Sequence, residues 1–196
     1  MPLLAAIAAN WQKALPVLAA LGLVAWYACF RDAPTTEQAL FAALLVIYML
    51  HQIEEHLWPG GFRQFTNSHV FKSGNDNWPV DIDGVALINI AYVWLPVGAA
   101  ALFPDTLRWV GLGWVGLTLV NGISHIVTSI RFRGYNPGLV TSIVLFLPFT
   151  LWMLARGPYS GAEIAGIVVA GVLLHIPVAG LFVVPYLRRR QHAATA

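Results

Sequence analysis

Six long apolar stretches restrict most strongly how this 196-residue chain can fold. They cover approximately residues 14–30, 37–58, 84–103, 107–130, 138–155 and 163–187. A helix needs roughly 20 apolar residues to cross the hydrocarbon core of a bilayer, so each stretch is a candidate span. Only 10% of the residues are charged, compared with about 25% in an average soluble domain. The sequence therefore predicts an all-α fold, a single polytopic membrane bundle of about six transmembrane helices over residues 1–196.

The basic residues predict the orientation of these six spans. An even number of spans puts both termini on one side. Eight basic residues then lie on that side, namely Lys13, Arg63, Lys72, Arg131, Arg133, Arg188, Arg189 and Arg190. Three lie on the other side, namely Arg31, Arg108 and Arg156. Basic loops stay preferentially in the cytoplasm. Both termini are therefore predicted to be cytoplasmic, and the Ala- and Gly-rich composition favours a bacterial inner (plasma) membrane.

The polar run at residues 51–56 ends the second apolar stretch. An ionisable group inside a bilayer costs roughly 3 kcal/mol on insertion scales, so such clusters are rare without a function. On a helix, His51, Glu54 and Glu55 stand at i, i+3 and i+4 and are predicted to share a face. Two adjacent carboxylates in a low-dielectric site need compensating cations or a proton. The run therefore predicts a site for a metal ion or for proton transfer.

Further polar residues are predicted to gather at the same cytoplasmic end. Asn121 and His125 lie at i and i+4 in the fourth stretch. His69 falls in the polar segment at 59–83, and Tyr135 and Asn136 fall in the next cytoplasmic loop. The candidate metal ligands are His51, Glu55, His125, Glu54, His69 and His56. The candidate substrate-binding residues are Asn121, Tyr135 and Asn136.

Imidazole and carboxylate ligands suit zinc, iron or manganese better than calcium. Among these divalent metals zinc is favoured and iron is second. In the favoured arrangement His51 and Glu55 ligate zinc, His125 completes the set, and Glu54 is the general base. The predicted function is a membrane-embedded metal-dependent enzyme, most readily a hydrolase of a lipid-like or other hydrophobic substrate that enters from the bilayer.

Two other functions stay open at this point. An iron-dependent, possibly di-iron, oxygenase would use both glutamates and several histidines, although the chain lacks the H-x-x-x-H and H-x-x-H-H runs of membrane hydroxylases. A proton or metal-ion carrier or channel needs polar groups across the whole membrane, where Asn89 and His175 are the main candidates. The net charge of +2 does not indicate nucleic acid. The expected partners are the lipid bilayer and the substrate, and the oligomeric state stays open.

Three local motifs predict helix ends. Thr36 is expected to cap the second helix and Ser160 the last, because their hydroxyls can accept free N–H groups of a first turn. Pro137 is expected in the first turn of the fifth helix, where its fixed φ is favourable.

The chain resembles the HXXEE membrane protein family, which is named for its motif and has no established activity. The resemblance rests on His51-x-x-Glu54-Glu55, Asn121-x-x-x-His125 and Tyr135-Asn-Pro-Gly138-x-x-Thr141, and covers about 48–154. It supports a functional site at these motifs and implies no particular substrate.

Overall fold

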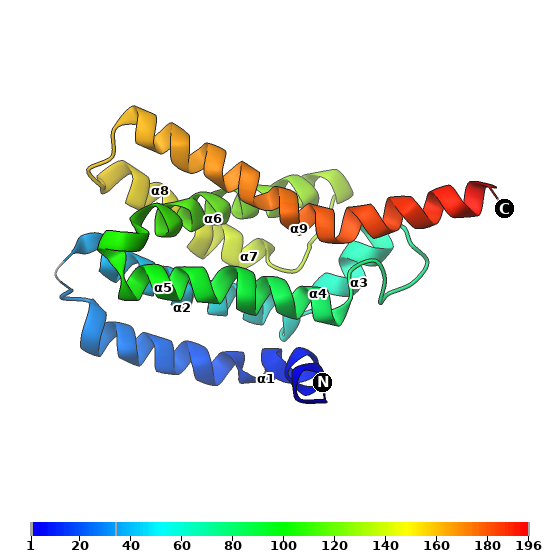
Figure 1. Ribbon diagram of the computed structural model, residues 1–196, viewed down its shortest axis with the longest axis horizontal. Helices are drawn as coiled ribbons and strands as arrows, with labels where there is room; N and C mark the ends of the chain where they lie inside the picture. The colour runs from blue at the N-terminus through cyan, green and yellow to red at the C-terminus, as the bar shows by residue number, and fades with distance from the viewer. Residues whose placement is uncertain (1, 34, 196) are drawn as a thin grey trace.

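The computed structural model describes residues 2–33 and 35–195, and the regular structure within them is all helical (Figure 1). Six helices in this part of the chain are long and apolar enough to cross a membrane. They cover Leu3–Phe30, Thr36–His56, Ile82–Leu102, Pro104–Phe132, Leu139–Arg156 and Gly161–His192. The prediction of an all-α fold with about six long apolar helices is therefore confirmed.

Several of these helices contain π-helical turns (η). The first span consists of α1 (Pro2–Ala25) and η1 (Trp26–Phe30), and the second is α2 (Thr36–His56). The third consists of α4 (Ile82–Ala86), η3 (Leu87–Trp94) and α5 (Leu95–Leu102), and the fourth is α6 (Pro104–Phe132). The fifth consists of α7 (Leu139–Thr141), η4 (Ser142–Phe146) and α8 (Leu147–Arg156), and the sixth is α9 (Gly161–Thr195). The short helices α3 (Phe62–Phe65) and η2 (Thr66–Val70) connect α2 to α4. Such π-helical turns are frequent at functional sites.

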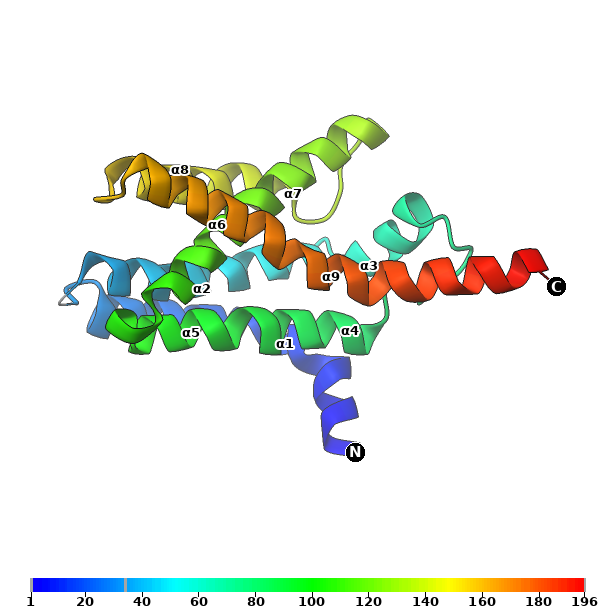
Figure 2. The same ribbon diagram turned by 45° about the horizontal axis from the view of Figure 1, so that its top comes forward.

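The first helix starts well before the predicted residue 14. The polar residues Asn10 and Gln12 interrupt the apolar pattern, but both side chains donate hydrogen bonds to backbone carbonyls of the same helix. The helix therefore continues through them. Its first part turns away from the rest of α1 in Figure 2, and Pro16 lies inside the helix. Proline removes a backbone hydrogen bond and bends a helix in this way.

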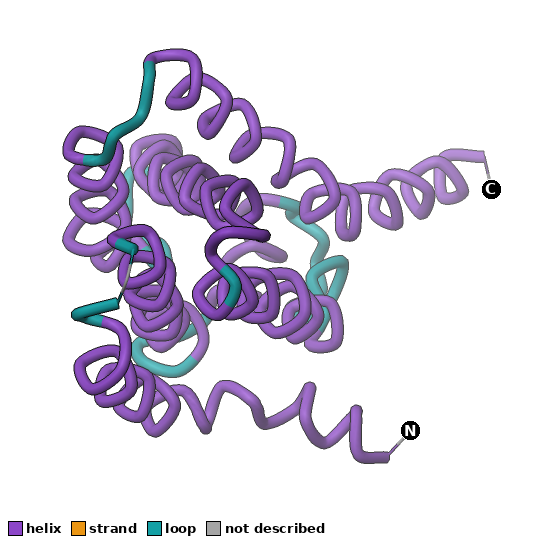
Figure 3. The backbone as a smooth tube through the Cα atoms, turned by 60° about the vertical axis from the view of Figure 1, so that its left-hand side comes forward, coloured by secondary structure: helices purple, strands orange, loops and turns teal. Residues whose placement is uncertain are grey.

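Consecutive spans run in opposite directions, so the two ends of the described chain and α3 lie toward the same end of the bundle, on the right in Figure 1. Figure 3 shows the helices surrounding a common interior, with the last part of α9 extending away from them. The side of a membrane that this end faces stays a prediction.

Close backbone packing joins α6 to α9. An added Cβ atom at Gly116 would overlap the carbonyl of Ile167, and one at Gly171 would overlap the carbonyl of Gly116. Small residues allow helices in membranes to approach in this way. Aromatic and aliphatic side chains of α2 and α6, such as Phe41 and Leu112, fill the neighbouring interior. This packing fixes α6, which carries part of the polar cluster described next.

The predicted N-terminal cap of the last helix is confirmed, and that of the second helix differs by one residue. Ser160 accepts a hydrogen bond from the Glu163 N–H at 3.2 Å, and the Glu163 carboxylate accepts one from the Ser160 N–H at 2.9 Å. This reciprocal pair confirms the predicted cap. The second helix is capped by Thr35 instead of Thr36. The backbone of Thr35 is extended, and its hydroxyl accepts the Gln38 N–H at 3.1 Å.

Candidate metal centre

Three of the predicted ligands meet in the interior of the bundle. His51 and Glu55 lie one turn apart on α2, and His125 faces them from α6. One potential ligand atom of each residue lies within 4.8 Å of the other two. The Oε1 atom of Glu55 is 3.5 Å from His51 Nε2 and 3.3 Å from His125 Nε2. All three residues are buried, with His51 only 1% exposed.

The hydrogen bonds around His51 determine which of its nitrogens carries the proton. Its Nδ1 lies 2.8 Å from the hydroxyl oxygen of Thr141, and that hydroxyl donates to Glu54 Oε2 at 2.5 Å. The Thr141 oxygen therefore accepts from His51 Nδ1–H. The lone pair of His51 is then on Nε2, which is buried and has no hydrogen-bond partner in the described part of the chain. An imidazole held in this way is prepared to ligate a metal through Nε2.

Asn136 orients His125 in the same manner. The side-chain amide of Asn136 donates to the backbone carbonyl of His125 at 2.9 Å, so its oxygen faces the ring. That oxygen lies 2.7 Å from His125 Nδ1 and accepts a hydrogen bond from Nδ1–H. When the His125 ring is neutral, its lone pair is therefore also on Nε2, toward Glu55.

When both rings are neutral, the centre brings together three hydrogen-bond acceptors, namely two imidazole lone pairs and one carboxylate oxygen. A cation offsets the repulsion among these buried groups, and it can be a bound metal ion or a proton on one of the rings. Two histidines and one glutamate are a donor set of catalytic zinc sites. Two histidines and one carboxylate also hold mononuclear iron in many oxygenases. The residues therefore fit a divalent transition-metal ion.

Gly138 lets the loop before α7 pass close to both histidines. A Cβ atom at this position would lie 2.5 Å from His125 Cε1 and 2.8 Å from His51 Cε1. The φ angle of Gly138 is +95°, which residues with a side chain rarely adopt. This left-handed residue is the N-cap of α7, so the helix begins at Leu139. Pro137 consequently precedes the helix, and its predicted place in the first turn is wrong.

Glu54 points to the start of the fifth span. Its carboxylate accepts hydrogen bonds from the backbone N–H groups of Val140 and Thr141 at 3.0 and 2.7 Å. The hydroxyls of Thr141 and Tyr135 donate to it as well, at 2.5 and 2.9 Å. The free N–H groups of the first turn of a helix usually donate hydrogen bonds to the side chain of the residue just before that helix. Gly138 has no side chain, and Glu54 of α2 takes this role instead.

This arrangement changes the interpretation of Glu54. Its two oxygens already accept four hydrogen bonds, and Glu54 does not line the central cavity described below. The geometry therefore supports a positioning role for Glu54, through Thr141 to His51. The ligand and general-base roles expected from the sequence stay predictions. Burial and the bond to Glu54 raise the pKa of Tyr135, so its phenol stays protonated and continues to donate.

The other predicted residues are divided between the centre and its surroundings. His56 Nε2 lies 3.4 Å from the second oxygen of Glu55 and 3.3 Å from the side-chain nitrogen of Asn89. His56 is therefore next to the centre. His69 is exposed, with its ring stacked on Phe65 at 4.7 Å. The structure does not bring His69 to the other predicted ligands.

The predicted substrate-binding residues have different surroundings. Asn121 and Asn136 both line the central cavity, as that prediction requires. Tyr135 and Asn136 are engaged with Glu54 and His125, which indicates that they position the centre. Sequence reasoning missed Thr141 as the partner of His51. The signal was available, because Thr141 is the last residue of the third motif quoted above.

The centre opens into a cavity of about 280 Å³ between α2, η3, α6 and α9. Its polar lining includes His51, Glu55 and His125, and most of the remaining lining is apolar. A site of this kind, apolar with a few converging polar groups, is typical of ligand-binding pockets.

Thr141 offers a direct test of the hydrogen-bond chain to His51. Thr141→Val keeps the shape of the side chain but removes the hydroxyl that accepts the Nδ1 proton. We expect the affinity for the bound metal to fall about 10–100-fold, the usual effect of losing such a partner. Thr141→Ser keeps the hydroxyl and is expected to bind metal nearly as well as the wild type. Competition with a chromogenic chelator measures both affinities, and equal affinities for the two variants would contradict the role of the hydroxyl.

Comparison with known proteins identifies the family. No curated protein and no solved structure matches the chain. The model of one family, described as "Protein of unknown function with HXXEE motif", matches residues 42–153. This segment is more than half of the chain and contains His51, Glu54, Glu55 and His125, together with the loop that carries Asn136 and Gly138. The chain therefore belongs to the HXXEE family of proteins of unknown function.

Proposed function

We propose that this protein is a membrane-embedded enzyme that depends on a divalent metal ion. The observation that carries the proposal is the convergence of two oriented Nε2 atoms and Glu55 Oε1 beside an apolar cavity. His51, His125 and Glu55 are the proposed ligands, and zinc is the favoured metal. Three protein ligands leave a coordination position for substrate or water, as in catalytic zinc sites.

Hydrolysis is the reaction that this donor set supports best. A divalent ion held there would act as a Lewis acid on a carbonyl or phosphoryl oxygen and make water more nucleophilic. The apolar lining of the cavity favours a lipid-like or otherwise hydrophobic substrate. The carboxylate of Glu54 is occupied by the first turn of α7, so the proton acceptor is proposed among the groups that line the cavity.

The outer surface supports a location in the membrane. The side chains of Leu21 and Val24 on α1 and of Leu173 and Ile176 on α9 are all more than half exposed. Extended apolar surfaces of this kind are unfavourable in water and favourable in lipid. We keep the orientation predicted from the basic residues, with the centre near the cytoplasmic leaflet of a bacterial inner membrane.

A mononuclear iron oxygenase is the second candidate, because two histidines and one carboxylate are also its characteristic ligand set. The di-iron alternative is less favoured, since Glu54 does not share the centre. A carrier is less favoured too. Among the described residues, the interior of α2 and α6 toward the opposite end is filled by side chains such as Phe41 and Leu112. His175 bonds to the Gly171 carbonyl of its own helix.

Elemental analysis of the purified protein tests the proposal. We expect about one divalent ion per chain in the wild type. His51→Ala, Glu55→Ala and His125→Ala should each lose the ion, whereas His69→Ala, a change at an exposed histidine of the same end, should retain it. Zinc would direct assays to hydrolysis of lipids and peptides, and iron would direct them to oxygen-dependent reactions. A well-folded wild-type protein without any metal, even after incubation with zinc or iron, would overturn the proposal.

A further inference from the structure

We propose that the substrate is an amphiphile with an anionic head group, bound across the centre with its chain in the central cavity and its head group beside Arg63. The chemistry at this site rests on the proposed function, but the binding of the amphiphile can be measured separately. The proposal comes from a second cavity that shares Glu55 with the first.

The central cavity has the lining expected for a hydrocarbon chain. Beyond the metal centre most of its lining surface is apolar and comes from three different spans, with side chains such as Val93, Leu117 and Phe182. Polar side chains, among them Gln52 and Asn121, line smaller parts of it. Transfer of apolar groups from water to such a lining is favourable, by about 0.8 kcal/mol for each buried methylene. The chain of an amphiphile would therefore occupy this side.

The second cavity is smaller and more polar. It encloses about 180 Å³ between the start of α1, the end of α2 and α3. Its polar lining comes from Gln12, Arg63 and Gln64, in addition to Glu55 and His56. Most of its exposed lining is polar, in contrast to the central cavity.

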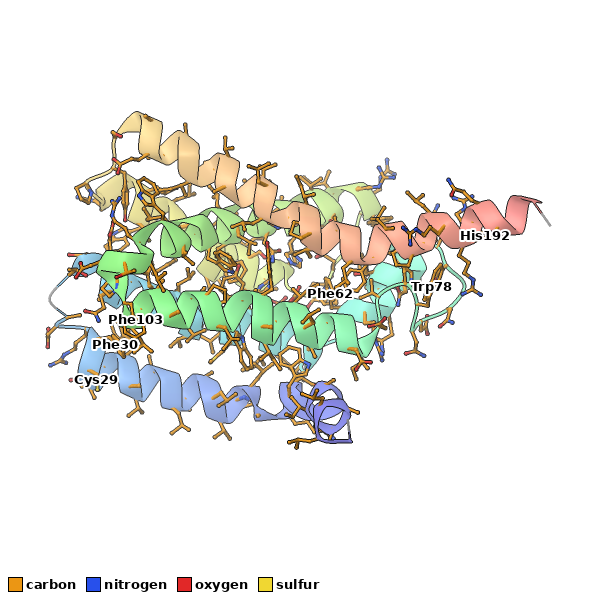
Figure 4. The ribbon with its side chains drawn as sticks, viewed as in Figure 1. Cys29, Phe30, Phe62, Trp78, Phe103 and His192 are labelled. Carbon is orange, nitrogen blue, oxygen red and sulfur yellow. The ribbon has the colours of Figure 1, made fainter. Side chains whose placement is uncertain are left out.

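The two cavities are neighbours on either side of a few shared residues next to the proposed metal. Glu55, His56, Phe62 and Val85 line both of them. Phe62 is labelled in Figure 4, where it lies within the bundle near α9 and α4. A ligand that extends from one cavity into the other would therefore pass Glu55. This places the bond between the chain and the head group of an amphiphile next to the centre.

The charges in the second cavity favour an anion. Arg63 is partly buried and forms no ion pair with any residue that the structure describes. Glu55 is the acidic residue of this lining, and the cation proposed at the centre would offset its charge. Arginine binds phosphate and carboxylate groups through paired N–H donors. The side-chain oxygen of Gln12 is buried without a hydrogen-bond partner in the described part of the chain and would accept a hydrogen bond from a hydroxyl of the head group.

The position of Arg63 also fits the orientation of a lipid. Arg63 belongs to α3, which follows the second span and lies outside the six membrane-crossing helices. The central cavity extends from there between the spans. A lipid in a bilayer likewise has its head group at the interface and its chain in the hydrocarbon core. An amphiphile could thus enter the site without turning over.

Binding of simple amphiphiles tests this proposal. The protein is reconstituted in phosphatidylcholine nanodiscs with its metal content recorded, and decyl phosphate, decanol and inorganic phosphate are titrated by calorimetry. We expect the wild type to bind decyl phosphate at least tenfold more tightly than either of the other two. Arg63→Gln should lose this preference and Arg63→Lys should keep part of it. Arg131→Gln, which removes an exposed charge at the same end, should keep all of it.

The possible outcomes separate this proposal from the proposed function. A preference for decyl phosphate that depends on Arg63 supports the head-group site, even in a protein that contains no metal. Equal binding of decyl phosphate and decanol, or an unchanged preference in a folded Arg63→Gln variant, overturns it. Inorganic phosphate that binds as tightly as decyl phosphate also overturns it, because the site would then recognise a small anion alone. None of the three contrary results removes the metal centre.

Discussion

Replacing Gly138 with alanine is expected to abolish metal binding while leaving all three proposed ligands in the chain. The added Cβ atom would lie 2.5 Å from His125 Cε1 and 2.8 Å from His51 Cε1, so at least one ring must move. The left-handed backbone of residue 138 adds a cost of about 1–2 kcal/mol for a residue with a side chain. We expect metal affinity to fall more than about 100-fold, since loss of a well-placed ligand is more severe than loss of its hydrogen-bond partner.

Gly134→Ala is the matched control for this prediction. Gly134 lies in the same loop, but an added Cβ atom there would have only the Phe132 carbonyl oxygen nearby, at 3.9 Å. Metal content and thermal stability should be close to those of the wild type. If Gly138→Ala also bound metal normally, the close approach of this loop to the two histidines would be wrong.

Replacing Glu54 with alanine is expected to cause the largest loss of stability. It would leave two backbone N–H groups of the first turn of α7 and the hydroxyls of Thr141 and Tyr135 without their acceptor. An unsatisfied buried polar group costs about 1–3 kcal/mol. Because Tyr135 is partly exposed and can bond to water, we expect a decrease of about 3–5 kcal/mol in the free energy of unfolding, together with weaker metal binding.

Two further variants give this prediction its specificity. Glu163→Ala removes a cap at the opposite end of the bundle and should lower stability while leaving metal affinity unchanged. Glu54→Gln replaces one acceptor oxygen by a donor amide and should weaken both stability and metal binding. Normal stability and metal binding in Glu54→Gln, combined with loss of turnover, would instead favour the general-base role predicted from the sequence.

The long helices could be predicted because a membrane span needs a long apolar run, which is visible in the sequence. The start of the first helix could not be predicted from the sequence. Asn10 and Gln12 are polar, and the bonds of their side chains to the helix backbone are a feature of the folded chain. The cap of α2 was displaced by one residue because Thr35 and Thr36 have the same side chain, and only their backbone angles distinguish them.

The candidate centre was predictable where helix geometry alone determines it. His51 and Glu55 are four residues apart and therefore lie on one face of α2. Glu54 is three residues from His51 and lies near the same face, so spacing alone does not tell which glutamate joins the centre. The position of α7, which bonds to Glu54, decides it. Thr141 lies 90 residues from its partner His51, and Asn136 bonds to His125 across the loop that follows α6. The contacts that reveal their roles depend on how this loop and α7 pack.

The bond from Glu54 to α7 also bears on how the chain assembles in a membrane. Until α2 is in place, the start of the fifth span lacks its acceptor, and a free N–H group in hydrocarbon is costly. The same carboxylate fixes Thr141 and thereby His51. Docking of the fifth span and formation of the proposed ion site are consequently coupled. An ion bound only by the assembled protein would shift that equilibrium by mass action, so metal supply would help to determine how much of the bundle is fully assembled.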